Sequence, residues 1–230
     1  MSEHPAELLG QLATIDTPTV CNALESVAPQ RRGFGYTVEP LVCTRPELGV
    51  MVGYARTATI RARHPADRRN SPGDYYDYID NGGPKPAISM IQDLDGDARG
   101  YGSFWGEVNS NIHKGLGCLG VITDGSVRDL PDVADGFQML ADRVGPSHAF
   151  VHVVSFGGQI NVCGMTVMDG DLVHADQHGA VVIPHDVADK VMDAAAAIAR
   201  REGVIIAAAK APGFNVEKLK AAQGKSAEIH

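Results

Sequence analysis

Glu107, Arg128 and Asp129 are the residues whose types and spacing best suit chemistry on a small anion. An arginine offers a planar fork of N–H donors that binds a carboxylate through two parallel hydrogen bonds. Asp and Glu supply the hard oxygen ligands that Mg²⁺ prefers. These residue types indicate a site at which a divalent metal and an arginine hold a small carboxylic acid.

The sequence around these three residues predicts a β-α-β unit that brings them together. Apolar runs at residues 86–94 and 118–123 predict strands, and residues 107–116 between them predict a helix. The helix starts after Gly106, so the N–H groups of its first turn point outward and can receive a carboxylate. If the strands are parallel, their carboxyl ends share one edge of the sheet, where ligands commonly bind.

Arg128 and Asp129 follow the second strand and a turn predicted at residues 124–125. Each also has a structural explanation. Asp129 precedes a Leu-Pro-Asp sequence, which is the pattern of a helix N-cap. Arg128 suits an ion pair with Asp124 or Asp132, and Glu107 favours a helix dipole by about 0.3–1 kcal/mol. The sequence leaves these alternatives open.

The rest of the chain mixes hairpins with β-α-β units. Thr17, followed by proline, is predicted to cap a helix over residues 17–28. Residues 63–85 are polar and are interpreted as an insertion or lid around a short helix at 74–79. Residues 211–230 are interpreted as a polar tail, partly disordered or reaching a neighbouring subunit. Further strands are predicted at residues 36–42, 51–62, 150–154, 161–168, 172–175 and 180–183, with turns at 169–170 and 177–179 and a long helix at 186–210.

Composition excludes several classes of protein. The 230 residues are 44% hydrophobic, which suffices for a sizeable core, and we expect residues 1–230 to form one domain. The net charge of −8 argues against a nucleic-acid partner. We find no secretory signal and no run of about 18 apolar residues, and therefore expect a cytoplasmic protein without a membrane partner. The cysteines lack a CxxC pair, so no disulfides are expected; they are Cys21, Cys43, Cys118 and Cys163.

Two familiar patterns have structural explanations. Residues 115–120 match G-x-G-x-x-G, but these glycines end a helix and enter a strand, the reverse of a dinucleotide site. His174 and His178 have the spacing of zinc ligands on a helix, yet a surface turn in a β-rich region explains them better. Lys85 and Lys114 are Schiff-base candidates on composition alone, and the chemistry above requires neither.

The chain resembles the RraA-like family along most of its length. This family includes the 4-hydroxy-4-methyl-2-oxoglutarate and 4-carboxy-4-hydroxy-2-oxoadipate aldolases, which release pyruvate. The similar segments are TPTVCNAL, VGYARTATI, WGE, GVITDGSVRD and GMTVMDGDLVHADQHGAVVIP. In the aldolases an acidic residue, often Asp, precedes an Arg-Asp pair at the spacing seen here, where 20 residues separate Glu107 from Arg128.

The resemblance implies a fold, an assembly and roles for particular residues. The fold is a β/β/α swivelling-domain sandwich with mixed sheets, and the assembly is a homotrimer or homohexamer with active sites near subunit boundaries. Asp129 binds Mg²⁺ or Mn²⁺, with Glu107 and Asp132 as further acidic candidates, and Arg128 holds a small 2-oxo acid. The substrate carboxylate contacts the turn formed by Gly106, Glu107, Val108 and Asn109, and Glu202 is contributed by a neighbouring subunit.

The implied reaction is a retro-aldol cleavage of a 4-hydroxy-2-oxo acid, with decarboxylation of oxaloacetate as a side activity. A divalent metal acts as a Lewis acid that stabilises the pyruvate enolate. A water oriented by Glu107 or Glu202 serves as the base. One rival is a non-catalytic regulator of RNA degradation, a role also found in the family among members that lack the acidic residue after the arginine. Another is a lyase or isomerase that acts on a sugar acid or aromatic breakdown product, with residues 63–85 as a specificity wall.

Overall fold

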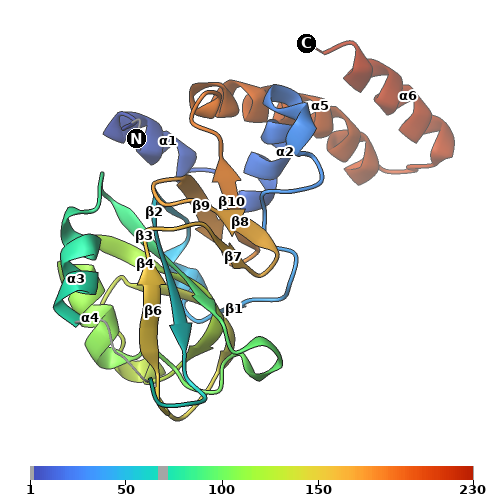
Figure 1. Cartoon of the computed structure of the whole chain (residues 1–230). Helices are drawn as coiled ribbons and strands as arrows, with labels where there is room; N and C mark the ends of the chain where they lie inside the picture. The colour runs from blue at the N-terminus through green and yellow to red at the C-terminus, as the bar shows by residue number, and fades with distance from the viewer. Residues whose placement is uncertain (1–2, 67–71, 230) are drawn as a thin grey trace.

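A mixed sheet forms the centre of the computed structural model, which describes residues 3–66 and 72–229 (Figure 1). Within this part of the chain the sheet has eight strands in the order β1-β5-β4-β3-β2-β9-β10, with β6 paired to β2. Strands β2 to β5 are parallel to one another, whereas β1, β6, β9 and β10 pair antiparallel with their neighbours. The strands are β1 (Val42–Cys43), β2 (Met51–Arg61), β3 (Ala87–Asp93), β4 (Cys118–Val127), β5 (Gln138–Val144), β6 (His152–Phe156), β9 (Leu172–Asp176) and β10 (Gly179–Ile183).

Two different layers cover the faces of this sheet. A hairpin of β7 (Ile160–Val162) and β8 (Met165–Val167) packs its apolar residues against one face. Helices α3 (Pro72–Asn81) and α4 (Glu107–Gly115) lie on the other face, over a core that includes Tyr75. The α/β fold and its β/β/α layering are therefore as predicted.

Helices from both ends of the chain close the β9–β10 side of the sheet. They are α1 (Ala6–Leu12), α2 (Thr17–Val27) and α5 (Val191–Lys210), and they share one apolar cluster with β2, β9 and β10. Asp16, rather than Thr17, caps α2, because its Oδ1 accepts a hydrogen bond from Thr19 N at 2.9 Å.

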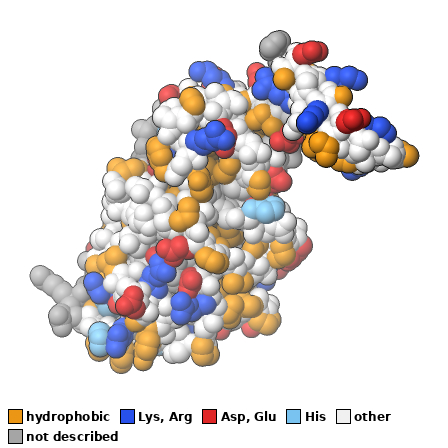
Figure 2. Space-filling view, turned by 90° about the vertical axis from the view of Figure 1, so that its right-hand side faces the viewer, with side chains coloured by type: hydrophobic (Ala, Val, Ile, Leu, Met, Phe, Trp, Pro, Cys, Tyr) orange, Lys and Arg blue, Asp and Glu red, His pale blue; other side chains and the backbone are white. Residues whose placement is uncertain are grey.

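In the predicted polar tail, α6 (Val216–Ala227) is a regular helix capped by Asn215, so this part of the tail is ordered, and contact of the tail with a neighbouring subunit stays a prediction. Helix α6 packs against α5, and Ser226 Oγ donates to Arg201 O at 2.9 Å. The end of α5 and α6 together extend away from the sheet as a helical arm (Figures 1 and 2).

Strand β5 was not predicted, and the turn predicted at residues 124–125 is wrong because both residues lie inside β4. Gln138 to Val144 are mostly helix-favouring residue types, and pairing with β4 overrides that preference. Residues 36–42 contribute only the bridge from Tyr36 to Val181 and the first residue of β1. Short 3₁₀ helices complete the structure: η1 (Pro29–Arg31), η2 (Pro46–Leu48), η3 (Gly96–Ala98), η4 (Leu130–Asp132) and η5 (Ala188–Lys190).

The predicted insertion over residues 63–85 contains α3, which is longer than expected and buries Tyr75 and Ile79 in the core. Residues 67–71 of that insertion lie outside the described residues, and a lid function stays a prediction. All four cysteines are free thiols, with Cys118 and Cys163 buried. No helix among the described residues has the length and apolar composition that crossing a bilayer requires.

Candidate active site

The end of β4 and the start of α4 lie next to each other. Trp105 forms a parallel bridge with Val127, and Arg128 N donates to Trp105 O at 2.9 Å. This pairing aligns the segment before α4 with the segment after β4. It therefore brings Gly106 and the backbone of Glu107 beside Arg128 and Asp129, the convergence that the sequence led us to expect.

Asp129 has an unusual backbone conformation that directs its carboxylate toward α4. Its φ of 54° and ψ of 38° place it in the left-handed region, where a non-glycine residue costs about 1–3 kcal/mol, with Asp among the better tolerated. Its Oδ2 accepts a hydrogen bond from Glu107 N at 3.3 Å and lies 3.6 Å from Arg128 Nε. The side chain makes no capping hydrogen bond to η4, the helix that follows it. Asp129 therefore caps α4, not the helix that the Leu-Pro-Asp sequence had suggested.

Glycine is needed at position 106 because neighbouring atoms approach it closely. Its backbone conformation is not the reason, since a φ of −169° is ordinary extended backbone. A Cβ at this position would lie 2.4 Å from Asp129 Oδ2 and 3.1 Å from Arg128 Cγ. The missing side chain leaves room for the carboxylate at the N-terminus of α4, where negative charge is favoured.

The other predicted site residues divide into two groups. The side chains of Glu107 and Val108 are exposed on the first turn of α4. Asn109 is engaged within the protein, since its Nδ2 donates to Phe104 O at 2.6 Å and its Oδ1 accepts from Tyr76 at 2.7 Å. A ligand would therefore meet the backbone of this turn and not the Asn109 amide.

Asp132 and Glu202 lie farther from the carboxylate of Asp129. Asp132 is exposed, and its N–H closes η4 by donating to Asp129 O at 2.9 Å. Glu202 is exposed on α5, which Figure 1 shows at the other end of the molecule from α4. Within one subunit the structure does not bring Glu202 to Arg128; its contribution from a neighbouring subunit stays a prediction.

A cavity of about 570 Å³ borders the Arg128–Asp129 pair. Its lining combines these two charged residues with an apolar wall, and it consists of Arg128, Asp129, Leu130, Pro131, Val144, Gly145 and Pro146. Both charged side chains are about one-third exposed, so a small ligand can reach them.

Helix α4 is fixed in place by the buried residue His113. Its Nε2 lies 2.9 Å from Tyr75 Oη and its Nδ1 lies 2.7 Å from Asn109 O. Burial lowers the pKa of His113 to about 4, so the ring is neutral near pH 7. The ring also packs against Trp105, with centroids 4.4 Å apart. These contacts hold the first turn of α4 in register with β4.

The donor set near Asp129 suits a hard divalent cation that keeps part of its hydration. No three His, Cys, Asp or Glu side chains come together as a metal site in the described part of the chain, so Glu107 and Asp132 do not complete a three-carboxylate cage with Asp129. Mg²⁺ commonly binds through one or two carboxylates together with water and substrate oxygens. The Asp129 carboxylate, next to an accessible cavity and an arginine, fits that mode of binding.

His174 and His178 have separate structural roles. His178 lies in the turn before β10, as predicted, and pairs with Asp176 at 3.0 Å. His174 lies in β9, within the strand predicted at residues 172–175, where it is buried and contacts Thr17 Oγ1 at 3.0 Å. The helix-to-strand order of the glycine-rich segment is as predicted, with Gly115 ending α4 before β4 begins.

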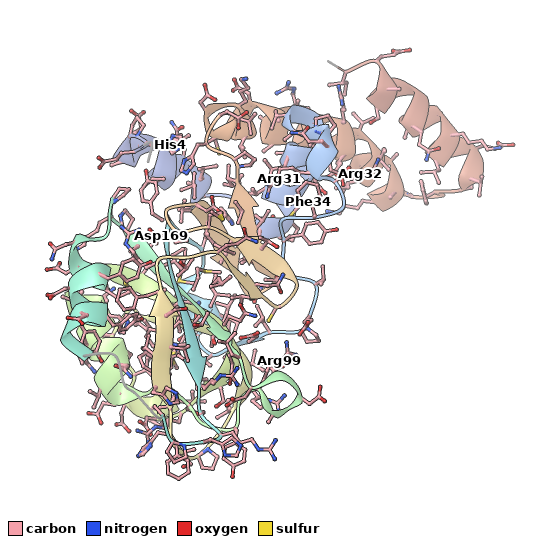
Figure 3. All side chains as sticks on the ribbon, in the orientation of Figure 1. His4, Arg31, Arg32, Phe34, Arg99 and Asp169 are labelled. Atoms are coloured by element: carbon pink, nitrogen blue, oxygen red, sulfur yellow. The ribbon has the colours of Figure 1, made fainter. Side chains whose placement is uncertain are left out.

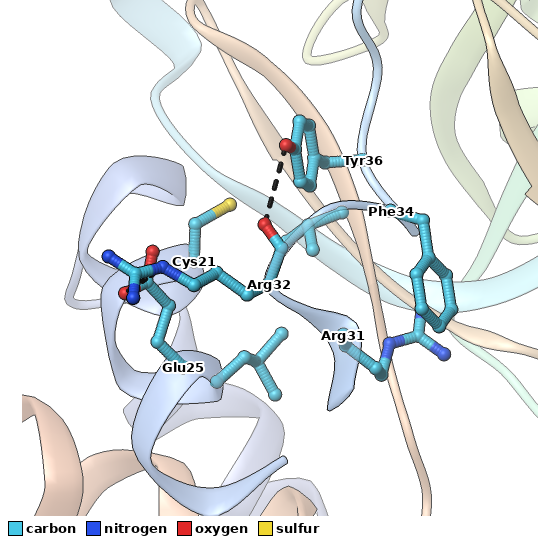
Figure 4. A pocket seen from close by; sticks show the side chains of 8 residues that line it. Cys21, Glu25, Arg31, Arg32, Phe34 and Tyr36 are labelled. Carbon is cyan, nitrogen blue, oxygen red and sulfur yellow. Dashed lines mark hydrogen bonds and ion pairs between the residues drawn. The ribbon is translucent and has the colours of Figure 1, made fainter. Parts of the chain in front are cut away.

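A smaller cavity of about 130 Å³ lies beneath the loop after α2 (Figure 4). Its charged groups are already paired: Arg32 lies 3.2 Å from Glu25, and the Arg31 guanidinium packs over the Phe34 ring at 5.2 Å. Burial raises the pKa of Cys21 to about 11, which keeps this thiol protonated. These contacts indicate a structural role.

Sequence reasoning missed one buried group with a strongly shifted pKa. Asp124, expected in a surface turn, is only 3% exposed within β4. Burial raises its pKa to about 7. In the sequence, Asp124 directly follows a run of apolar and β-branched residues. A predicted strand that continued past residue 123 would have placed this aspartate in the sheet.

Comparison with known proteins identifies structures of the same fold. The chain superposes on an uncharacterized protein from Pseudomonas syringae pv. tomato with a TM-score of 0.72 and 22% identity, covering 96% of this chain and 95% of the other. It also matches RraAS2 from Streptomyces coelicolor, described as an unusual member of the RNase ES inhibitor RraA protein family, with a TM-score of 0.68 and 20% identity over 88% and 97% of the two chains.

A curated relative matches a shorter part of the chain. An uncharacterized protein of Methanocaldococcus jannaschii is 28% identical over 115 residues, which are 49% of this chain and 55% of that protein. The chain thus spans about half the length of the relative it matches. A family model described as RraA-like, Aldolase/RraA, matches residues 17–182. That match covers most of the chain, including β4 and the Arg128–Asp129 pair, and the protein therefore belongs to the RraA-like family.

Proposed function

We propose that this protein is a cytoplasmic, divalent-metal-dependent lyase that cleaves a 4-hydroxy-2-oxo acid between C3 and C4 and releases pyruvate. The observation that carries the proposal is the left-handed Asp129, whose carboxylate lies at the N-terminus of α4 beside Arg128 and borders a cavity. Residues held in strained backbone conformations cluster at active sites and ligand-binding sites.

Arg128 and the first turn of α4 would hold the substrate carboxylate. The guanidinium binds the two carboxylate oxygens as a fork. N–H groups in the first turn of a helix have no carbonyl partner within that helix, so those beyond Glu107, whose N–H donates to Asp129, are available to the same anion. The substrate is then oriented before any bond breaks.

Asp129 would hold the metal together with water. When bound, Mg²⁺ or Mn²⁺ supplies positive charge that stabilises the negative charge developing on the keto oxygen as the C3–C4 bond breaks. Arg128 adds further positive charge at the same end of the substrate.

Glu107 is the nearest candidate for the proton transfer that starts the cleavage. Its exposed carboxylate at the start of α4 can accept the proton of the 4-hydroxyl group, directly or through one water. The electrons of that O–H bond form the new carbonyl, those of the C3–C4 bond form the enolate, and a proton returned to C3 gives pyruvate. Glu202 of a neighbouring subunit is the second candidate for this role, within a homotrimer or homohexamer. Decarboxylation of oxaloacetate would use the same groups and lose CO₂ in place of the aldehyde or ketone.

The test is a screen of the purified protein for pyruvate release from several 4-hydroxy-2-oxo acids and from oxaloacetate. We expect activity with Mg²⁺ or Mn²⁺, loss of activity in chelator, and recovery when the metal is restored. Full activity in chelator would contradict the metal-dependent mechanism.

The same experiment separates the lyase from a non-catalytic regulator of RNA degradation; the Streptomyces coelicolor protein is described as an unusual member of an RNase ES inhibitor family. Regulators of this family lack the acidic residue after the arginine, whereas this chain has Asp129. No pyruvate from any substrate, combined with binding to an RNA-degrading endonuclease, would favour the regulator.

A further inference from the structure

A second cavity, of about 610 Å³, lies near the carboxyl ends of β3 and β4 and shares no lining residue with the cavity beside Asp129. Its lining is mainly polar, with two arginines, two amides and three carboxylates among Gln92, Asp93, Leu94, Gly96, Asp97, Arg99, Asp124, Arg143 and Asn161. Figure 3 shows Arg99 at the loop that follows β3. This edge of a parallel sheet is where small molecules commonly bind.

One of the buried carboxylates in this cavity is structural. Asp93 accepts hydrogen bonds from Asp95 N at 3.0 Å and from Gly100 N at 2.8 Å, one on each oxygen. It therefore ties down both ends of the loop that carries Arg99, and each of its oxygens already accepts one hydrogen bond.

Asp124 differs because one of its oxygens has no hydrogen bond. Oδ1 accepts from Asp93 N at 2.7 Å, but Oδ2 lies 3.7 Å from Arg99 Nη1, beyond hydrogen-bond distance. Asp124 is 3% exposed and lines the cavity. A carboxylate oxygen at the wall of a cavity can accept a further hydrogen bond from a ligand or a water molecule.

The opposite side of the cavity supplies hydrogen-bond donors. Arg99 is anchored through Nη2 to Glu39 at 2.8 Å, while its Nη1 points toward Asp124. Gln92 and Asn161 use their carbonyl oxygens to accept backbone N–H groups, at 3.0 and 3.1 Å, which leaves their amide nitrogens as donors. Arg143 contributes a second guanidinium, which is half exposed and pairs through its Nε with Asp142.

We propose that this cavity binds a small hydroxy carboxylate, with the ligand's carboxylate on Arg99 and Arg143 and a ligand hydroxyl donating to Asp124 Oδ2. A metal ion alone fits less well, because two arginines, Arg99 and Arg143, place positive charge in the same cavity. The ligand needs both functional groups, since the arginines select an anion and Asp124 selects a hydrogen-bond donor. This site is independent of the proposed lyase reaction.

The test is calorimetric titration of the full-length protein with gluconate, a hydroxy carboxylate. Propionate, which lacks hydroxyls, and glycerol, which lacks a carboxylate, should bind more weakly than gluconate. Arg99→Gln and Asp124→Asn should each weaken gluconate binding about tenfold or more, the effect of losing one hydrogen bond to a charged group. Asp124→Asn keeps the Oδ1 acceptor for Asp93 N, and melting curves will verify that both variants fold.

Glu39→Gln is the matched control, because it breaks the same ion pair as Arg99→Gln but leaves the guanidinium in place. It should bind gluconate as well as wild type or more tightly. Arg128→Lys should also bind normally, because Arg128 does not line this cavity. The proposal is overturned if wild type shows no binding at millimolar gluconate, if Arg99→Gln binds as wild type does, or if Arg128→Lys abolishes binding. None of these outcomes depends on pyruvate release, so the two proposals can fail separately.

Discussion

At the scale of single residues, Asp129 combines a left-handed backbone with a carboxylate that receives the N-terminus of another helix. If Asp129 only capped η4, its side chain would accept a hydrogen bond from a backbone N–H group of η4. The observed direction, with Arg128 at 3.6 Å and a cavity alongside, suits both capping of α4 and the ligand binding proposed above. Two substitutions separate these two roles.

Asp129→Asn should reduce kcat/KM about 10²-fold or more, because it removes the negative charge that holds the metal. The Tm should change little, because Asn also accepts a hydrogen bond from Glu107 N–H and tolerates the left-handed region. Arg128→Lys should be similarly severe, since an ammonium cannot form the bidentate fork. The exposed Asp135→Asn is the control and should change neither quantity. Near-normal activity in Asp129→Asn would return this residue to a structural role.

Gly106→Ala should also reduce activity, because the added methyl group would lie 2.4 Å from Asp129 Oδ2 and must displace the carboxylate. Gly115→Ala, at the last residue of the same helix, meets no atom within 4 Å. It should keep full activity and gain up to about 1 kcal/mol of stability. Kinetics and melting curves of the two variants check this, and equal activity in both would show that the carboxylate does not need its observed position.

At the scale of elements, α4 depends on the neutral form of His113. Folding lowers the pKa of this histidine from 6.5 to about 4. Its contribution to stability is therefore complete above pH 6.5 and is lost as the pH falls through 4.

We expect the Tm of the wild type to fall more steeply between pH 6.5 and 4 than that of His113→Gln, which keeps a donor and an acceptor but does not titrate. The exposed His148→Gln is the control for loss of an imidazole. Parallel melting profiles for wild type and His113→Gln would show that protonation of His113 does not limit the stability of the fold in acid.

The elements that the sequence predicted correctly are those with strong local signals. The helices α2 and α4 have periodic apolar residues and first-turn signals, and β2, β9 and β10 have apolar or β-branched runs. Strand β5 and the second half of β4 lack such signals, since their residues become strand only by pairing with each other. The Arg128–Asp129 site could be located from the sequence, but the capping of α4 by Asp129 depends on the Trp105–Val127 bridge, a tertiary contact that no local pattern encodes.

At the scale of the whole molecule, the helical arm of α5 and α6 exposes apolar side chains. Ile206 is 49% exposed and Val216 is 65% exposed, and Figure 2 shows hydrophobic side chains along the lower surface of the arm. Since Ala222 and Ser226 are buried, α6 is firmly attached to α5. An arm of this kind suits contact with another subunit.

We predict a homotrimer or a multiple of it, measured by light scattering at micromolar concentration. Removing residues 211–230 should shift the protein toward smaller species, because the truncation deletes the outer helix of the arm. Lys220→Ala, a change on the same helix that removes one exposed charge, should leave the assembly unchanged. A monomeric wild-type protein would contradict both the assembly and the shared role of Glu202.

Strand β2 has partners on both sides along much of its length: β3 pairs with residues from Tyr54 to Ile60, while β9 and β6 pair with its two ends on the other side. The helices that pack on β9 and β10 are thus joined to the layer of α3 and α4 through one shared strand. If β9 and β10 separate from β2 in a local opening of the sheet, β2 can remain paired to β3. Amide hydrogens of β2 that bond to β3 should therefore exchange with deuterium more slowly than those of β10, and mass spectrometry of peptides from the two strands would reveal which part of the molecule opens first.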